Sequence, residues 1–182
     1  MPTITAKRTS NAVDVQALLA RLTACDATIA IMGMGYVGFP LAIATHAKGY
    51  NVLAYDVDAR KIEKLNASKS YLKGIEDSAV ADMMATKRFV ATADAHELAK
   101  ADVLIMCVPT PLTKHREPDM SYVVTTTETI AAHLRLGQLV VLESTTYPGT
   151  TTDVLKPLLE KTGLVSGVDF FLAYSPERED PG

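Results

Sequence analysis

Residues 28–58, TIAIMGMGYVGFPLAIATHAKGYNVLAYDVD, contain the pattern that most restricts the fold of this chain. A short apolar run leads into the turn GMGYVG, an apolar helical pattern follows and ends at Gly49, and a second apolar run ends on Asp56. Strand, glycine turn, helix, strand and acid in this order are typical of a βαβ unit that binds a dinucleotide. An ordinary glycine turn is the alternative, and the agreement of all the flanking elements disfavours it.

Each glycine of the turn has a predicted task. Gly33 permits a tight turn out of the strand, Gly35 lets a pyrophosphate approach the backbone, and Gly38 allows the helix to pack close to the strands. The N-terminus of that helix offers N–H groups and the positive end of its dipole to the phosphates. The turn therefore predicts a pyrophosphate site.

Asp56 lies where a carboxylate can accept hydrogen bonds from the adenosine ribose hydroxyls. It would repel a 2′-phosphate, so it favours NAD over NADP as the cofactor. Arg60 and Lys61 follow closely and weaken that preference.

Composition excludes several classes of protein. The 182 residues are 48% hydrophobic and 21% charged, with a net charge of −3, which indicates a soluble globular chain with one core. The charge gives no support for a nucleic-acid or membrane-surface role, and no apolar run approaches the ~20 residues that span a bilayer. Without a signal sequence, and with Cys25 and Cys107 as the only cysteines, we expect reduced thiols and a cytoplasmic location. The four histidines have no metal-ligand spacing.

Strand-like and helix-like patterns alternate along the chain, which predicts an α/β fold: a doubly wound, Rossmann-like parallel sheet with helices on both faces. We expect residues 1–24 to form a tail and a helix beside the first strand, and residues 25–182 to form the sheet domain. The expected strands are 29–32, 51–55, 89–91, 103–108, 139–142 and 170–173. The expected helices are 11–24, 37–47, 58–66, 76–85, 95–99, 122–134 and 150–161, the last interrupted by Pro157.

The loops that should follow these strands carry recognisable motifs. GMGYVGFPLA, DVDARK, CVPTPL, ESTTYPGTT and SPEREDPG occur in this order over nearly the whole chain. Together they resemble the N-terminal NAD-binding part of the UDP-glucose/GDP-mannose dehydrogenase family, the nucleotide-sugar 6-dehydrogenases. The forms ESTTYPGTT and SPEREDPG most resemble the branch that acts on UDP-N-acetylglucosamine.

The resemblance implies an enzyme that oxidises the C6 primary alcohol of a UDP-sugar to a carboxylate with two NAD, for the synthesis of surface polysaccharides. It implies a homodimer or larger oligomer of the full-length protein. UDP-glucose, UDP-N-acetylmannosamine and GDP-mannose remain alternative substrates. A non-catalytic NAD-binding module is the alternative from outside the enzymes.

The resemblance also implies roles for residues on the cofactor side. Asp56 and Lys61 would hold the adenosine side of NAD, Tyr36 and Val37 would cover the pyrophosphate turn, and Thr110 would line the nicotinamide side. Without the resemblance, Lys61 would be a solvated lysine and Thr110 a turn residue beside proline.

On the substrate side, the resemblance implies that Thr145 binds NAD and hydrogen-bonds a water or the reacting oxygen. Glu177 would lie at the sugar as a base or water-positioning carboxylate, and both Glu177 and Arg178 would bind the substrate. Thr145 as a turn residue and a Glu177–Arg178 ion pair are the structural alternatives. Two roles remain open for Glu143: a direct role in the active site, or a structural role in which its carboxylate accepts hydrogen bonds from loop N–H groups. Ser70 and Tyr71 match a family loop near the active site, and a surface loop explains them equally well.

Family members use a cysteine nucleophile in a C-terminal half, which forms a thioester. This chain ends at Gly182, before the central helix and the C-terminal UDP-sugar-binding domain of the family. Cys107 ends an apolar run and is expected to be structural. We expect this chain to be the cofactor half of a larger enzyme, with at best weak NAD binding and no turnover alone.

Overall fold

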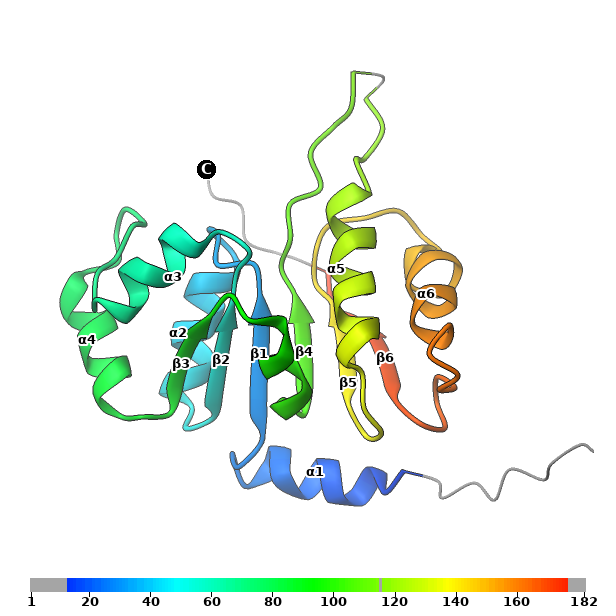
Figure 1. Ribbon diagram of the computed structural model, residues 1–182, viewed down its shortest axis with the longest axis horizontal. Coiled ribbons are helices and arrows are strands. Elements are labelled where there is room, and N and C mark those ends of the chain that lie inside the picture. Colours follow the sequence, from blue (N-terminus) through cyan, green and yellow to red (C-terminus); the bar gives the residue numbers. More distant parts are fainter. Residues whose placement is uncertain (1–12, 115, 177–182) are drawn as a thin grey trace, which may run out of the picture.

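Six parallel strands form a single sheet in the computed structural model, which describes residues 13–114 and 116–176. The strand order is β3-β2-β1-β4-β5-β6 (Figure 1). The strands are β1 (Thr28–Met32), β2 (Asn51–Tyr55), β3 (Phe89–Thr92), β4 (Val103–Met106), β5 (Leu139–Leu142) and β6 (Phe171–Tyr174). The chain leaves β1 toward one edge of the sheet and leaves β4 toward the other. These adjacent strands therefore flank a topological switch point, which confirms the predicted doubly wound sheet.

The strands form where short apolar runs can be covered on both faces. In β1 every residue from Ile29 to Met32 is at most 5% exposed. Only β4 differs clearly from its predicted extent, because it ends at Met106 instead of residue 108. Cys107 still donates its N–H to Met32 O, but the Val108 N–H turns to Ser144 Oγ and Pro109 has no N–H. The regular ladder therefore stops two residues early.

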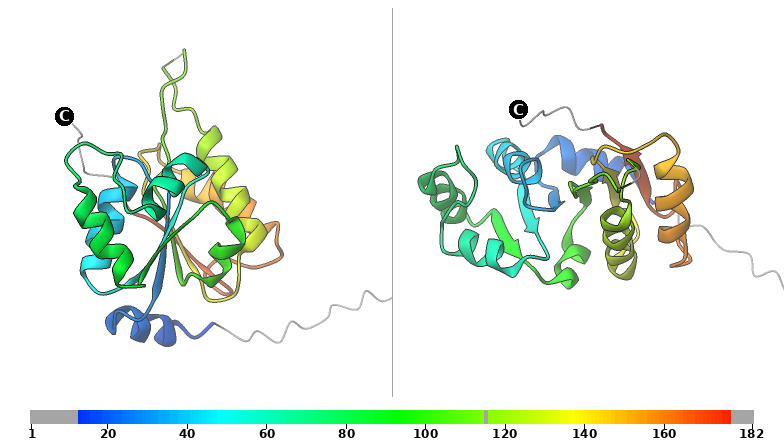
Figure 2. Two further views of the ribbon diagram at one scale, coloured as in Figure 1. Left: turned by 60° about the vertical axis from the view of Figure 1, so that its left-hand side comes forward. Right: turned by 90° about the horizontal axis from the view of Figure 1, so that it is seen from above.

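Helices cover the sheet from two sides (Figure 2). Ile29 and Ile31 pack in one apolar cluster with side chains of α2 (Gly38–Ala47), α3 (Ala59–Asn66) and α4 (Asp77–Ala85). Ala30 and Met32 pack in a second cluster with side chains of η1 (Ala95–Lys100), α5 (Ser121–His133) and α6 (Lys156–Glu160). The alternation along β1 thus separates two half-cores, as a sheet buried on both faces requires.

Two predicted helices differ in type from an α-helix. Residues 95–100 form a 3₁₀-helix, and the predicted helix 150–161 divides into a π-helix, η2 (Thr150–Leu155), and the short α6. Pro157 lies in the first turn of α6, where its missing N–H costs little. The division therefore accommodates a proline that would disrupt a continuous α-helix. In the part of the chain that the structure describes, no helix has the length and apolarity to cross a membrane.

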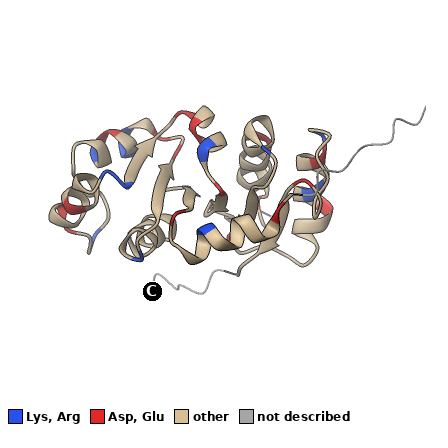
Figure 3. Cartoon of the chain, turned by 90° about the horizontal axis from the view of Figure 1, so that it is seen from below, with Lys and Arg blue, Asp and Glu red and all other residues tan. Residues whose placement is uncertain are grey.

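The first helix, α1 (Val15–Thr23), lies across the amino ends of the strands (Figures 1 and 3). The expectation that it packs beside β1 is wrong, because its contacts are with residues that precede several strands. Tyr50, just before β2, donates its hydroxyl to Leu22 O at 2.8 Å, and Val13 N, in the segment that leads into α1, donates to Val168 O at 3.4 Å. None of the α1 side chains is fully buried.

Asp102 fastens α1 to the sheet. This side chain lies directly before β4 and is 5% exposed. Its Oδ1 accepts from Arg21 Nη1 at 2.6 Å and from Arg135 Nη2 at 3.0 Å, while Oδ2 accepts from Thr28 N at 2.8 Å. A buried carboxylate with three donors is well satisfied. It links α1, β1 and the segment before β5 at the edge opposite to the strand-end motifs.

Candidate functional site

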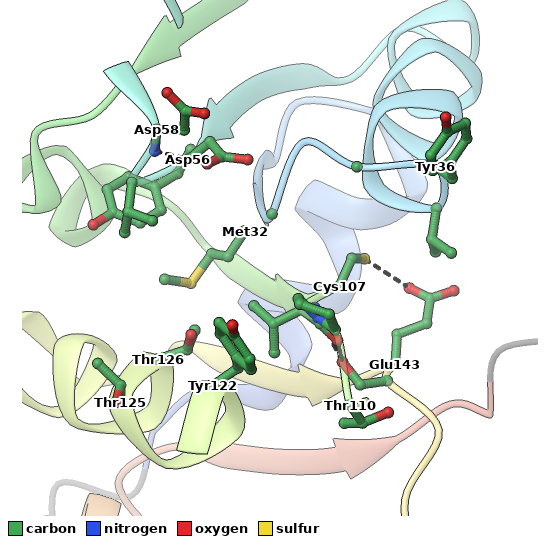
Figure 4. Close-up of a pocket in the computed structure, with 18 of the residues that line it drawn as sticks. Met32, Tyr36, Asp56, Asp58, Cys107, Thr110, Tyr122, Thr125, Thr126 and Glu143 are labelled. Atoms are coloured by element: carbon green, nitrogen blue, oxygen red, sulfur yellow. Dashed lines mark hydrogen bonds between the residues drawn. The ribbon is translucent and has the colours of Figure 1, made fainter. Parts of the chain in front are cut away.

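A cavity of about 900 Å³ opens at the carboxyl edge of the sheet, beside the switch point (Figure 4). Its walls come from the turn after β1, the ends of β2, β4 and β5, and the first turns of α5. All the residues predicted to hold the cofactor line it except Gly38: Gly33, Gly35, Tyr36, Val37, Asp56, Lys61, Thr110 and Thr145. Segments far apart in the sequence therefore meet at one cavity.

Gly33 and Gly38 let the turn and the helix pack tightly against β4. Gly33 has φ +98°, and a Cβ there would lie 2.5 Å from the Cys107 carbonyl oxygen. A Cβ on Gly38 would overlap the Gly33 carbonyl and lie 3.2 Å from Cys107 Cβ. Gly38 thus serves close packing below the cavity and does not line it, in keeping with its predicted task.

Gly35 differs from both, because a Cβ at this position would meet no atom within 4 Å. Its backbone φ lies outside the left-handed region. Nothing in the fold itself therefore demands glycine here. Because Gly35 lines the cavity, a side chain would occupy space that an approaching ligand could use. This is the cradle that a pyrophosphate needs at a dinucleotide-binding turn.

The α2 helix begins at the cavity without a side-chain cap. Val37 is its N-cap residue, and no side-chain hydrogen bond caps this terminus. The first N–H groups of a helix lack intrahelical partners, so an uncapped N-terminus favours an anion. Tyr36, 66% exposed, and Val37 border the cavity at this point.

Asp56 directly follows β2 and joins it to the glycine turn. This carboxylate is 5% exposed. Its Oδ2 accepts from Met34 N at 2.8 Å and from Lys61 Nζ at 2.7 Å, and Oδ1 accepts from Asp58 N at 2.8 Å. A carboxylate has about four acceptor sites. Oδ1 therefore keeps acceptor capacity for a ligand hydroxyl.

The two cations after Asp56 both contact carboxylates. Lys61 pairs with Asp56, and Arg60 donates from Nε and Nη2 to Asp58 at 2.9 Å each. The Arg60 hydrogen bonds lower the pKa of the Asp58 carboxyl. Asp58 also caps α3 by accepting from Arg60 N. Both cations are thus held by acids, which supports the preference for NAD over NADP that Asp56 indicates.

Hydrogen bonds join the loop after β4 to the loop after β5 at the other end of the cavity. Thr110 Oγ1 donates to Thr145 O at 2.8 Å. Ser144 Oγ accepts from Val108 N at 3.0 Å and donates to Val108 O at 2.7 Å. Thr110 is half-buried and Thr145 is exposed at the rim. The hydroxyl of Thr110 therefore fixes the loop that presents Thr145.

Cys107 and Glu143 directly follow the adjacent strands β4 and β5. The Cys107 thiol donates to Glu143 Oε2 at 3.7 Å (Figure 4). Both residues line the cavity, and Cys107 is 9% exposed beneath the glycine turn. Cys25 and Cys107 form no disulfide. In the described part of the chain, no cluster of three or more His, Cys, Asp or Glu could hold a metal ion.

Tyr71 supports the glycine turn from outside the cavity. Its hydroxyl donates to Met34 O at 2.8 Å, and its ring stacks on Phe39 with centroids 5.5 Å apart. Burial, followed by the nearby carboxylates Asp56 and Asp58, raises the pKa of Tyr71. Ser70, in the same loop, donates its N–H to Asp77 Oδ1 at the start of α4. The loop around Tyr71 thus braces the turn, and neither Ser70 nor Tyr71 lines the cavity.

One cavity wall was missed from the sequence. The first turns of α5 contribute a line of hydroxyl-bearing side chains, Ser121, Tyr122, Thr125 and Thr126. Their spacing by four residues places them on one helix face, but the run of threonines signals only a weak helix. The predicted substrate residues Glu177 and Arg178 lie outside the described residues.

Taken together, the residues fit a bound dinucleotide. An open glycine cradle and an uncapped helix N-terminus suit the pyrophosphate. Asp56, with acceptor capacity remaining, lies at one end of the cavity, and the fixed Thr110–Thr145 pair lies at the β4–β5 end. Binding at the switch point, outside the carboxyl ends of the strands, is the rule for such sheets.

Comparison with known proteins agrees with this geometry. The family model described as "UDP-glucose/GDP-mannose dehydrogenase family, NAD binding domain" matches residues 27–182. The UDP-N-acetyl-D-mannosamine dehydrogenase of Pyrococcus horikoshii is 37% identical over 155 residues, which cover 85% of this chain and 37% of that protein. The UDP-N-acetyl-D-glucosamine 6-dehydrogenase of Pseudomonas aeruginosa is 37% identical over 161 residues, covering 86% of this chain and 36% of that protein.

A solved structure shows the same fold. The UDP-D-ManNAc dehydrogenase of Pyrococcus horikoshii superposes with a TM-score of 0.79 at 38% identity, covering 85% of this chain and 37% of that chain. This chain therefore spans little more than a third of the length of the relatives that it matches. The chain belongs to the UDP-glucose/GDP-mannose dehydrogenase family and carries its NAD-binding domain.

Proposed function

We propose that this chain supplies the cofactor half of a nucleotide-sugar 6-dehydrogenase, which oxidises the C6 primary alcohol of a UDP-sugar to the uronic acid. One observation carries the proposal. A single cavity at the switch point is lined by residues from separate segments of the chain: the glycine turn, Asp56, Thr110 and Thr145. NAD⁺ bound there would accept a hydride in each of two oxidation steps.

The proposed roles follow from the polar groups around the cavity. The amides of the glycine turn and of the α2 N-terminus bind the pyrophosphate. Asp56 accepts from the adenosine ribose, and Lys61 keeps that carboxylate in place. Thr110 holds the Thr145 loop through its hydroxyl, so that the Thr145 side chain can hydrogen-bond a water or the reacting oxygen.

The proposed substrate is UDP-N-acetylglucosamine. The forms ESTTYPGTT and SPEREDPG support it, and the P. aeruginosa relative has that name. The P. horikoshii relative, named for UDP-N-acetyl-D-mannosamine, has the same identity of 37%, so overall similarity does not separate the two sugars. An assay of the protein encoded by the complete gene against UDP-N-acetylglucosamine, UDP-N-acetylmannosamine, UDP-glucose and GDP-mannose would test the choice. Preference for any sugar but the first would overturn it.

The second oxidation is assigned to a cysteine nucleophile outside this chain, with Glu177 as the base or water-positioning group. Cys107 does not suit the task. It lies beneath the glycine turn with only 9% of its surface exposed, and its thiol is engaged in a hydrogen bond to Glu143 Oε2. Cys25 comes just after α1, at the opposite edge of the sheet.

The experiment that tests the cofactor half uses the chain as it stands. We expect NAD⁺ to bind weakly, with a stronger response than NADP⁺, in a titration followed by NMR amide shifts. We expect no NADH to form when UDP-N-acetylglucosamine and NAD⁺ are both added. Absence of NAD⁺ binding would overturn the cofactor assignment. Steady NADH production by this polypeptide would overturn the assignment of the remaining catalytic groups to another segment.

A further inference from the structure

Glu143 has the same place in one half of the sheet that Asp56 has in the other. The last pair of β1 and β2 is Met32 with Tyr55, and the last pair of β4 and β5 is Met106 with Leu142. Met32 also pairs with Met106, so these four residues form one row across the sheet. Asp56 and Glu143 each come directly after this row. The two carboxylates therefore stand at one level, on opposite sides of the switch point.

Both carboxylates belong to the walls of the same cavity. Figure 4 draws Asp56 and Glu143 at opposite sides of it, with Met32 and Cys107 between them. Glu143 is half-exposed, and the Cys107 thiol donates to its Oε2. The strand end and the thiol thus hold a carboxylate at the cavity wall.

A dinucleotide has matching symmetry, because a ribose with two vicinal hydroxyls lies on each side of its pyrophosphate. Ribose hydroxyls are donors, and an ionised carboxylate is an acceptor with room for two of them. With the pyrophosphate on the glycine turn between the two acids, each acid faces one ribose. We propose that Glu143 accepts hydrogen bonds from the hydroxyls of the nicotinamide-side ribose, as Asp56 does for the adenosine ribose.

This inference rests on the proposed cofactor binding and adds a second ribose-binding residue to it. Glu143 is a binding residue in this assignment and takes no proton in the reaction. The competing explanation is that Glu143 only orients the Cys107 thiol and the loop after β5. The two explanations differ in which ligands a Glu143 variant should affect.

The test compares ligands that contain different parts of NAD⁺. ADP has the adenosine ribose and both phosphates, ADP-ribose adds the second ribose, and NAD⁺ adds the nicotinamide. We expect Glu143→Gln to weaken ADP-ribose and NAD⁺ about tenfold, the scale of one charge-assisted hydrogen bond, and to leave ADP within about twofold. Asp56→Asn should weaken all three. Glu128→Gln, the same charge change at an exposed position of α5 outside the cavity, should weaken none.

Dissociation constants from NMR titrations of the whole chain decide the matter. Equal affinities of wild type and Glu143→Gln for ADP-ribose would overturn the inference, as would an equal loss for ADP and ADP-ribose, which a loosened loop would cause. If Glu143→Gln lost affinity only for NAD⁺, the contact would be with the nicotinamide and not with the ribose, and this result would also overturn the inference. If the wild-type chain bound none of the ligands, the proposed cofactor binding would itself fail. If it bound NAD⁺ and only the Glu143 effect were missing, this inference alone would fail.

Discussion

The Asp56 carboxylate and the Met34 amide form a hydrogen bond of 2.8 Å that joins the end of β2 to the glycine turn after β1. On the other side of the same residue, Met34 O accepts from the Tyr71 hydroxyl at 2.8 Å. The middle of the turn is thus fixed at both backbone groups by side chains from elsewhere in the chain. The acid predicted to bind ribose also helps to shape the turn predicted to bind pyrophosphate.

Replacing Asp56 should therefore reduce both stability and cofactor binding. In Asp56→Ala the buried Met34 amide and the half-buried Asp58 amide lose their acceptor, so we expect the free energy of unfolding to fall by about 1–3 kcal/mol. NAD⁺ affinity should fall at least tenfold, since the ribose also loses its acceptor. Urea unfolding and NAD⁺ titration measure the two effects. Unchanged stability would show that these hydrogen bonds contribute little to the fold.

Alanine at Gly33 and at Gly35 should have opposite consequences. At Gly33 a Cβ would meet Cys107 O at 2.5 Å in a left-handed backbone, so we expect a loss of at least about 2 kcal/mol in unfolding free energy. At Gly35 a Cβ would enter open space, so stability should change by less than about 0.5 kcal/mol while NAD⁺ affinity falls at least tenfold. Thermal unfolding and NAD⁺ titration separate the cases. Wild-type affinity in Gly35→Ala would contradict a pyrophosphate at this turn.

Asp102 should matter for folding alone. Asp102→Ala removes a buried acceptor from Arg21, Arg135 and Thr28 N, so we expect a loss of about 2–4 kcal/mol in unfolding free energy. The cavity lies at the other edge of the sheet. Under conditions in which the variant is fully folded, its affinity for NAD⁺ should therefore stay within about twofold of the wild type. Urea unfolding measures the first effect and titration the second.

Arg21→Ala is the matched control, because Asp102 then keeps Arg135 and the Thr28 amide. The Arg21 side chain is 42% exposed, so its loss should cost less than about 1 kcal/mol. A cost as large as that of Asp102→Ala would show that α1 itself, and not the buried carboxylate, dominates this edge of the sheet.

His46 should make stability depend on pH. Its side chain is 7% exposed on α2, and burial, followed by the charge of Arg88, lowers its pKa below the usual 6.5. Between the two pKa values the unfolded chain binds more protons, so the unfolding free energy should fall as pH drops from about 7.5 to about 5.5. In this window carboxylates of ordinary pKa stay ionised.

The variant that tests this is His46→Gln, which can keep the hydrogen bond to Thr86 Oγ1, 2.8 Å from His46 Nε2 in the wild type. The urea midpoint should decrease between about pH 7.5 and about pH 5.5 in both proteins, and the decrease should be smaller in the variant than in the wild type. Equal changes in the two proteins would assign the pH dependence to other groups.

Local pattern was enough to predict the sheet and the glycine turn. Strands such as β1 are continuous apolar runs, and Gly33, Gly35 and Asp56 have tasks that follow from their place between a strand and a helix. The helix expected over residues 58–66 likewise forms as α3, with Asp58 as its N-cap. These features depend on residues close in sequence, which is why a single sequence reveals them.

The remaining features depend on contacts between distant segments. Asp102 lies 81 residues from Arg21 in the chain, so no spacing rule predicts that it fastens α1 across the amino ends. Tyr122 lines the cavity because α5 packs over β4 and β5, and its threonine-rich sequence suggests only a weak helix. The early end of β4 depends on Ser144, which takes the Val108 amide out of the ladder. The position of Glu143 opposite Asp56 becomes visible only once the strand order is known.

The position of α1 has a practical consequence for handling the protein. This helix crosses the amino ends of the strands, and the cavity opens at their carboxyl ends. Leu19 on α1 is 48% exposed, so a linker attached there would meet solvent. A sensor surface that captures the molecule through α1 would therefore hold every copy in one orientation, with the cofactor cavity facing the flowing solution.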